Sequence, residues 1–277
     1  MNLSSNIIRF YDVLGIEKTI DLFSEIGFKA IDFNADLEEF HTDVHGREFY
    51  KNLKSYAESK GIRFTQAHAP FGRMFEHNED CVRKIVKAFE NVSYLGTEMI
   101  VVHPCKHINY KDEEGKWMFD YNINFYKSLI PYAEEFGVKI AVENVNGTVT
   151  ETAKGLLYIY ESLNNPVFTI CLDAGHGNIV GEDPAEMIRS AGSRIGCTHI
   201  HDNDGKIDQH TLPFHGNTDW EAVMKAFADI DYKGNFNYEA SRFLKNVPDA
   251  LIVQGATYMA EVGKYLIERF ECYKTLA

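Results

Sequence analysis

The feature of this sequence that most constrains its fold is a regular alternation of short apolar runs with longer amphipathic stretches. Eight apolar runs have the length and β-branched content of buried strands and lie at 3–9, 29–33, 62–68, 98–103, 138–143, 167–173, 195–201 and 234–240. Stretches of helical periodicity separate them, among them 47–60, 78–95 and 120–136. A glycine often precedes the next run, as in KGIRF, LGTEM, FGVKI and YKGNF, where it suits a helix C-cap or a tight turn. The pattern predicts eight strands alternating with eight helices.

Such a chain can close into a barrel or lie as an open, doubly wound sheet. No G-x-G-x-x-G or P-loop glycine pattern follows the first run, which favours the barrel. The length of 277 residues suits one barrel, and no linker or low-complexity segment divides the chain. We therefore expect an α/β fold: a single-domain (β/α)₈ TIM barrel over residues 1–277.

Composition and charge indicate which binding partners and which cellular compartment to expect. The net charge of −13, without a long basic run, makes nucleic acid an unfavourable partner. The amino terminus lacks the pattern of a signal peptide, and no apolar run approaches the roughly 20 residues that cross a bilayer. The five cysteines are odd in number and form no C-x-x-C pair, which is typical of free thiols in a reducing compartment. We expect a cytoplasmic protein with no membrane contact.

Ionisable residues occupy the C-terminal ends of successive runs, from the third to the eighth. They follow one another at intervals of 26 to 40 residues and are His68, His103, Glu143, Asp173, His199 and Glu239. In a closed barrel these ends converge on one mouth, so the residues become neighbours. Chance would fill each position about half the time, so six positions out of six favour a shared function over a solvated rim.

Carboxylates and imidazoles gathered at one mouth repel and desolvate one another unless a cation is bound there. The set Glu143, Asp173, His199 and Glu239 is rich in oxygen and suits Mn²⁺, Co²⁺ or Mg²⁺, and it can also hold Zn²⁺. Period-two alternation in CTHIH places His201 on the same strand face as His199. His201 is therefore expected beside the metal or facing the substrate.

The motifs at these strand ends resemble those of the xylose isomerase-like TIM-barrel superfamily. They are HAPFG (68–72), VVHP (101–104), VEN (142–144), LDAGH (172–176), HIHDNDG (199–205), DQH (208–210) and YEAS (238–241). This superfamily contains sugar isomerases and epimerases and the AP endonucleases of the endonuclease IV type. The resemblance spans the third to the eighth strand, whereas the first 60 residues contribute only the barrel pattern.

The resemblance implies particular roles. Glu143, Asp173, His199 and Glu239 match the single metal site of the tagatose- and psicose-type 3-epimerases, in which the two glutamates also form the catalytic acid/base pair. His176 matches a histidine that touches the substrate in those enzymes.

A wider set matches a different branch of the superfamily. Together with the four ligands above, the nine-ligand, three-zinc pattern of endonuclease IV is completed by His68, His103, His176, Asp208 and His210. After DQH, however, this chain reads TLPFHGNTDW, where that branch has a glycine-glutamate-glycine turn, and the acidic chain suits a DNA-wrapping enzyme badly. One ion is the primary expectation, and up to three remain open.

Other candidates have two readings each. Phe71 and Trp220 either stack on a sugar or serve packing. Lys106 and Arg242 either meet a phosphate or carboxylate of the substrate or form ordinary salt bridges. Asp208 with His210 is alternatively a pair that caps a loop. No role is assigned to the remaining histidines, which are expected at the surface: His41, His45, His77 and His107.

Two functions from different classes follow. The first is metal-dependent isomerisation or epimerisation of a small sugar or polyol derivative through an enediolate, with Glu143 and Glu239 as acid and base. The alternative is phosphoester hydrolysis by several metal ions, as in AP endonucleases. A barrel that binds metal and ligand without turnover is a third reading. The oligomeric state stays open, although barrels of this kind often pair.

Overall fold

The computed structural model describes residues 1–71, 79–105 and 117–276. Eight parallel strands form one sheet in the order β7-β6-β5-β4-β3-β2-β1-β8. The strands are β1 (Leu3–Asn6), β2 (Ala30–Phe33), β3 (Arg63–His68), β4 (Met99–Val102), β5 (Lys139–Glu143), β6 (Phe168–Asp173), β7 (Ile195–His199) and β8 (Phe236–Tyr238).

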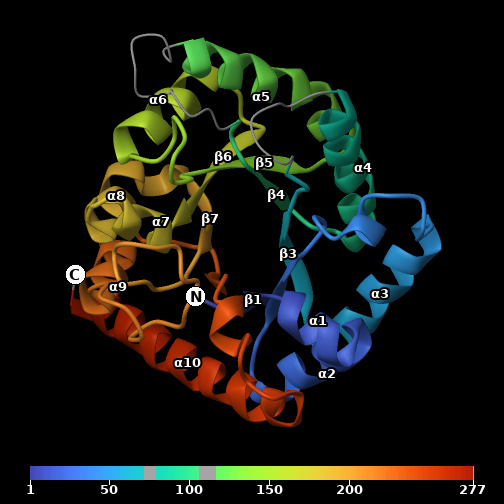
Figure 1. Ribbon diagram of the computed structural model, residues 1–277, viewed down its shortest axis with the longest axis vertical. Helices are drawn as coiled ribbons and strands as arrows, with labels where there is room; N and C mark the ends of the chain where they lie inside the picture. The colour runs from blue at the N-terminus through green and yellow to red at the C-terminus, as the bar shows by residue number, and fades with distance from the viewer. Residues whose placement is uncertain (72–78, 106–116, 277) are drawn as a thin grey trace.

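Backbone contacts beyond the end of β7 bring the two edges of this sheet together. Ile200 forms a parallel bridge with Tyr238, and its N–H donates to the carbonyl of Asn237 at 2.8 Å. The N–H of Glu239 donates in turn to the carbonyl of Ile200 at 3.0 Å. The strands therefore form a nearly closed ring (Figure 1), which confirms the single-domain TIM barrel and excludes the open sheet.

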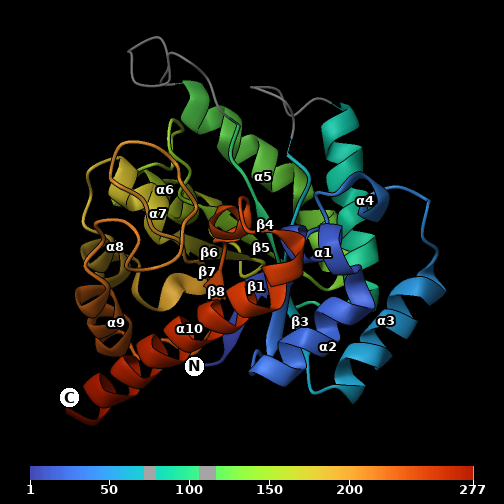
Figure 2. The same ribbon diagram turned by 60° about the horizontal axis from the view of Figure 1, so that its bottom comes forward.

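Helices surround this ring. The α-helices are α1 (Ile8–Leu14), α2 (Ile16–Ile26), α3 (Arg47–Ser59), α4 (Glu79–Leu95), α5 (Trp117–Phe136), α6 (Ala153–Leu163), α7 (Ala174–Ile179), α8 (Pro184–Ala191), α9 (Trp220–Asp229) and α10 (Ile252–Leu276). Short 3₁₀ helices are η1 (Glu38–Phe40), η3 (Gly192–Arg194), η4 (Ser241–Leu244) and η5 (Asp249–Leu251). Figure 2 shows α10 running along the outside of the barrel, where it packs on α9, α2 and β1. In the described part of the chain, no helix is both long and apolar enough to span a membrane.

The structure corrects several predicted boundaries. The first strand ends at Asn6 rather than at residue 9, because Ile8 already begins α1. Two helices instead of one follow β1, since Gly15 has a φ of 76° and interrupts the helical path. Two also follow β6, where the Asp173 side chain accepts a hydrogen bond from the N–H of His176 and caps α7. The expected eight helices are therefore too few.

The glycines before the strands do not all act in the same way. Gly61, Gly96 and Gly137 have φ values of 73°, 74° and 66°, as expected for the ends of helices. Gly234, before β8, is not in this left-handed region. A Cβ atom there would lie 2.2 Å from the hydroxyl oxygen of Tyr232, so close packing is the reason for this glycine.

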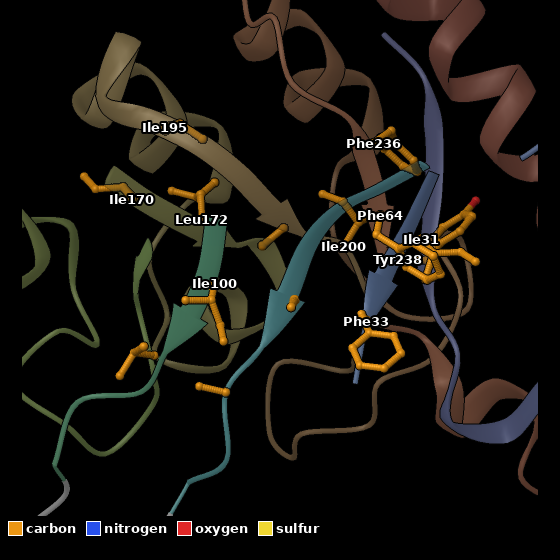
Figure 3. Close-up of a cluster of buried hydrophobic side chains, with 14 of the residues drawn as sticks. Ile31, Phe33, Phe64, Ile100, Ile170, Leu172, Ile195, Ile200, Phe236 and Tyr238 are labelled. Carbon is orange, nitrogen blue, oxygen red and sulfur yellow. The ribbon is translucent and has the colours of Figure 1, made fainter. Parts of the chain in front are cut away.

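The main core lies between the barrel and its helices. Apolar residues on the outer faces of the strands are buried there, as Figure 3 shows for Ile31, Phe33, Phe64, Ile100, Ile170, Leu172, Ile195, Ile200, Phe236 and Tyr238. A separate small cluster of Val101, Ala141, Cys171 and Cys197 is buried by itself. Cys81, Cys105, Cys171 and Cys197 are buried, and Cys272 is exposed. The ring of strands is thus held rigidly from outside, which fixes the positions of the strand ends.

Candidate metal centre

The strands bring the predicted ionisable residues to one end of the barrel. His68, Glu143, Asp173 and His199 are the last residues of β3, β5, β6 and β7. His103 is the first residue after β4, and Glu239 is the first residue after β8. Because all the strands are parallel, their C-terminal ends lie at the same mouth.

The central group consists of Glu143, Asp173, His199 and Glu239, each of which offers one ligand atom within 4.8 Å of the others. The Nδ1 atom of His199 lies 3.0 Å from Glu143 Oε1, 3.5 Å from Glu239 Oε2 and 4.0 Å from Asp173 Oδ2. The first three side chains are fully buried, whereas that of Glu239 is 18% exposed. Three carboxylates and one imidazole therefore converge on a common point with one open side.

The charges in this group are strongly coupled. Burial alone would raise the pKa of Glu143, but the neighbouring His199 and His103 hold it well below its usual range. Burial alone would likewise lower the pKa of His199, yet the carboxylates of Glu239 and Glu143 raise it well above its ordinary value. Among the described residues, histidines are the only cationic groups within 4.0 Å of these carboxylates. Without a metal, a proton on His199 offsets part of the carboxylate charge.

A second group shares Glu143 and adds His68 and His103. The two Nε2 atoms lie 3.0 Å apart, and Glu143 Oε2 is 2.8 Å from His103 Nε2 and 3.9 Å from His68 Nε2. Nδ1 of His68 faces the carbonyl of Ala69 at 2.9 Å, so this nitrogen carries the proton and leaves Nε2 free to bind a metal. Burial lowers the pKa of His103, which favours the neutral, metal-binding form.

A third group lies beside the first and contains His176, His201, Asp208 and His210. Asp208 Oδ2 is 2.8 Å from His210 Nε2 and 3.9 Å from His176 Nε2, and Asp208 Oδ1 is 3.9 Å from His201 Nε2. Burial alone would raise the pKa of Asp208, but His176 and His210 hold it far below its usual range. His201 also lies 3.1 Å from Asp173 Oδ1 and so links this group to the central one.

Backbone carbonyls orient the outer histidines of this third group. Nδ1 of His176 faces the carbonyl of Asn144 at 3.0 Å, and Nδ1 of His210 faces the carbonyl of Glu239 at 2.8 Å. Since a carbonyl only accepts hydrogen bonds, both Nδ1 atoms carry protons, and both Nε2 atoms face the carboxylate of Asp208. This is the arrangement that metal-binding histidines usually have.

The donor chemistry of all three groups fits divalent metal ions. Carboxylate oxygens and imidazole nitrogens are the ligands that Mn²⁺, Co²⁺ and Zn²⁺ prefer. Glu143 Oε2 and Asp208 Oδ1 are buried and lack a hydrogen bond of good geometry within the described part of the chain. Buried oxygens of this kind are costly unless a cation or a donor completes them. In the central group, the ligands of one ion would be Glu143, Asp173, His199 and Glu239.

Three polar residues near this site were missed by the sequence reasoning. Asp32 lies beneath His199, with its Oδ2 atom 3.3 Å from the histidine Nε2. Asn144 holds the end of β6 in place, because its amide accepts from the N–H of Asp173 and donates to the carbonyl of the same residue, both at 2.7 Å. The motifs VEN and HDND pointed to Asn144 and Asp202 only as neighbours of candidate ligands.

Asp202 organises the loop that carries Asp208 and His210. Its buried carboxylate accepts hydrogen bonds from the indole of Trp220 at 2.9 Å and from several backbone N–H groups, which belong to Asn203, Phe214, Gly216 and Thr218. Trp220 is only 1% exposed, so its ring serves packing and does not face a ligand. The stacking role considered for Trp220 is therefore wrong.

The remaining candidates have varied surroundings. Phe71 is 56% exposed and stacks on His103, with ring centroids 4.9 Å apart. Arg242 donates to the backbone carbonyl of Asp208 and lies 4.0 Å from its carboxylate. His41 is buried, contrary to the expected surface position, and His45 pairs with Glu39 at 2.9 Å. Lys106, His77 and His107 lie outside the described residues.

Comparison with known proteins places the chain in a family. Residues 20–262 match the family model described as xylose isomerase-like TIM barrel. The D-psicose 3-epimerase of Ruminiclostridium cellulolyticum is 25% identical over 231 residues, which cover 78% of this chain and 75% of that protein.

Solved structures show the same fold. A D-tagatose 3-epimerase-like protein superimposes with a TM-score of 0.79 at 23% identity, covering 100% of both chains. The IolI protein with a bound zinc atom superimposes with a TM-score of 0.77 at 19% identity, covering 99% of both chains. The match to the family model extends over most of the sequence, and the chain therefore belongs to the xylose isomerase-like TIM-barrel family.

Proposed function

We propose that this chain is a divalent-metal-dependent isomerase or epimerase of a small sugar or related polyol derivative. The observation that carries the proposal is the position of two glutamates in one four-residue group. Glu143 and Glu239 come from opposite parts of the sequence, and each places a carboxylate oxygen within 3.5 Å of the same nitrogen of His199. Sequence similarity to a D-psicose 3-epimerase supports a sugar substrate.

A divalent ion bound here would polarise a carbonyl and an adjacent hydroxyl of the substrate and so acidify the C–H bond between them. Glu143 and Glu239 then act as base and acid. One carboxylate takes the proton from carbon, which leaves an enediolate, and the other glutamate returns a proton. Return to the neighbouring carbon gives isomerisation, and return to the opposite face of the same carbon gives epimerisation.

The surroundings of the two glutamates favour a division of labour. Glu143 is fully buried and contacts histidines at the C-terminal ends of β3, β4 and β7, so its position is fixed by the barrel. Glu239 is 18% exposed and contacts only His199 and His210 among the cationic groups described. We propose that a sugar enters from the side of Glu239, because this is the most accessible part of the central group.

Phosphoester hydrolysis by several metal ions is the second candidate. It is favoured by one specific observation: the outer groups have histidines whose Nδ1 atoms face carbonyls and whose Nε2 atoms converge on Glu143 or Asp208. Adjacent ions could then stabilise both the attacking and the leaving oxygen. The net charge of −13 argues against DNA as the substrate.

Metal stoichiometry combined with a substrate panel separates the two. Elemental analysis compares wild-type protein, purified without chelator, with a His176→Ala, His210→Ala double variant and with His45→Ala, a control histidine outside the three groups. Ketoses are incubated with each protein in D₂O, and NMR follows deuterium entry beside the carbonyl. About one ion per chain, unchanged in the double variant, together with deuterium exchange, would support the epimerase or isomerase. About three ions, of which the double variant loses one, together with phosphoester cleavage and no exchange, would overturn it.

A further inference from the structure

Beneath the central group lies a buried carboxylate that the proposed chemistry does not use. Asp32 is in β2 and is 1% exposed. Its Oδ2 atom lies 3.3 Å from Nε2 of His199 and accepts hydrogen bonds from the amides of Gln66 at 3.0 Å and Asn237 at 2.9 Å. Strands β2, β3, β7 and β8 therefore all contribute to one polar cluster inside the barrel.

The backbone explains how Asp32 comes to point inward. The pairing of β2 with β3 shifts register between Ile31 and Asp32, so that Ile31 stands opposite Phe64 but Asp32 stands opposite Gln66. The extra residue is Thr65, in β3, and it re-aims Gln66 toward the inside of the barrel. Asp32 itself points inward because it alternates with Ile31 and Phe33, whose side chains lie in the outer core (Figure 3), and so Asp32 and Gln66 meet inside the barrel.

The two nitrogens of His199 have different surroundings as a result. Nδ1 faces the carboxylates of Glu143, Asp173 and Glu239. Nε2 faces Asp32 and has no other acidic partner among the described residues. An imidazole that binds a metal through one nitrogen carries its proton on the other, and a carboxylate facing that proton fixes the tautomer and the ring orientation.

We infer that Asp32 is a positioning residue that holds His199 with Nδ1 directed at the metal and the proton on Nε2. The inference rests on the metal site proposed above. The amides of Gln66 and Asn237 both donate to the oxygen that faces His199, so this oxygen is held in place from two sides. Gln66 also lies 3.4 Å from the carbonyl of Thr198, next to the histidine.

A purely structural role would explain the burial of Asp32 less well. Its other oxygen, Oδ1, is buried without a hydrogen-bond partner in the described part of the chain. A carboxylate with an unpaired buried oxygen lowers stability. An asparagine at position 32 could accept the same hydrogen bonds from Gln66 and Asn237 without a buried charge. Retention of a charged group at this position is expected if its role is to face the Nε2 proton of a metal-bound histidine.

The first test is the affinity of Asp32→Asn for Mn²⁺. This variant keeps the shape of the side chain and removes its charge. Titration of metal-free protein against a fluorescent chelator is expected to give a Kd roughly 10- to 100-fold weaker than that of the wild type. The control is Asn91→Ala, which removes a buried side chain that bonds to the carbonyl of Phe40 outside the barrel. This control should lose stability without losing affinity.

The second test reads the wild-type protein, so its result does not depend on the folding of an Asp32 variant. In wild-type protein loaded with diamagnetic Zn²⁺, ¹⁵N NMR should find the His199 proton on Nε2 and the metal-shifted nitrogen at Nδ1, with the signal assigned by its loss in His199→Gln. A proton on Nδ1, or an unchanged Mn²⁺ affinity in a folded Asp32→Asn variant, would overturn the role of Asp32 alone. A wild-type protein that binds neither ion would overturn the proposed function as well.

Discussion

Glu143 Oε1 lies 3.0 Å from His199 Nδ1 at the mouth of the barrel, and both side chains are fully buried. An imidazolium and a carboxylate at this distance stabilise each other when no metal is bound. A metal ion that binds to the same two atoms must displace the proton from Nδ1. The stability of the protein should therefore depend on pH in opposite ways with and without metal.

The first prediction concerns this dependence. The raised pKa of His199 means that its stabilising contribution is complete below the unfolded value of about 6.5 and is lost as pH rises through the folded pKa. The lowered pKa of Glu143 means that its contribution is present above about 4.3 and is lost as pH falls through its folded pKa. Metal-free protein should thus be most stable between the two unfolded pKa values, at about pH 4.3 to about pH 6.5.

Thermal unfolding checks this prediction on chelator-treated and Mn²⁺-loaded protein from about pH 5.5 to about pH 8.5. The Tm of the metal-free protein should fall towards the alkaline end. The increase in Tm caused by metal should grow in the same direction, because fewer protons compete for the ligands. A constant difference between the two forms would contradict the coupling of protons and metal at this site.

The second prediction distinguishes the two glutamates. Glu143 belongs to two of the three groups, whereas Glu239 belongs only to the central one. Glu143→Gln should weaken metal binding at both groups, whereas Glu239→Gln should leave the His68 and His103 group unaffected. Either change should lower kcat at least about 100-fold, because each removes an acid or a base. Metal analysis and steady-state kinetics test this, with the exposed Glu17→Gln as a control. Normal turnover in both variants would exclude their catalytic role.

The third prediction concerns the loop that Asp202 organises. Asp202→Asn removes the charge that several backbone N–H groups and the Trp220 indole share. We expect a loss of about 2–3 kcal/mol in the free energy of unfolding, since hydrogen bonds to charged groups are worth that much. Urea unfolding measures it. Asp204→Asn, an exposed carboxylate in the same loop, should cost less than about 1 kcal/mol, and equal losses in the two variants would refute the special role of Asp202.

The fourth prediction concerns Gly175, in α7. A Cβ atom at this position would lie 2.0 Å from Cε1 of the buried His201 ring, so Gly175→Ala must displace the ring. Overpacking of this kind costs about 1–3 kcal/mol, and His201 should lose its contact with Asp173. Gly46→Ala is the matched control, because nothing lies within 4 Å of a Cβ atom there. Urea unfolding compares the two, and equal stability would show that the ring moves without cost.

The sequence predicted the strand ends best where a charged residue terminates an apolar run. Runs ending at Glu143 and Asp173 correspond to β5 and β6, which stop at those same residues. The prediction was poorer for the first run, because all four residues of β1 are buried although three of them are polar, whereas the apolar Ile8 already begins α1. Apolar periodicity indicates burial only where the buried residues are apolar, and it therefore does not mark the end of this strand.

The candidate site was predictable as a set of residues but not as a set of contacts. The position of Glu143, Asp173, His199 and Glu239 at predicted strand ends indicated that they are neighbours. In the structure their ligand atoms lie within 4.8 Å of one another. The burial of Trp220 was not predictable, because its indole bonds to the carboxylate of Asp202, which lies 18 residues earlier in the chain. The ligand and catalytic roles of the four residues of the central group stay predictions.

The sequence by itself determined the barrel and the mouth at which the ionisable residues gather, because strand period and residue order are local properties of the chain. Only the tertiary structure decided which atom faces which. Asp32 appeared in the sequence as one polar residue in an early apolar run, and its contacts with His199 and Gln66 follow from closure of the barrel and from the extra residue in β3 that turns Gln66 inward. Contacts of that kind depend on the packing of whole strands, which no local pattern encodes.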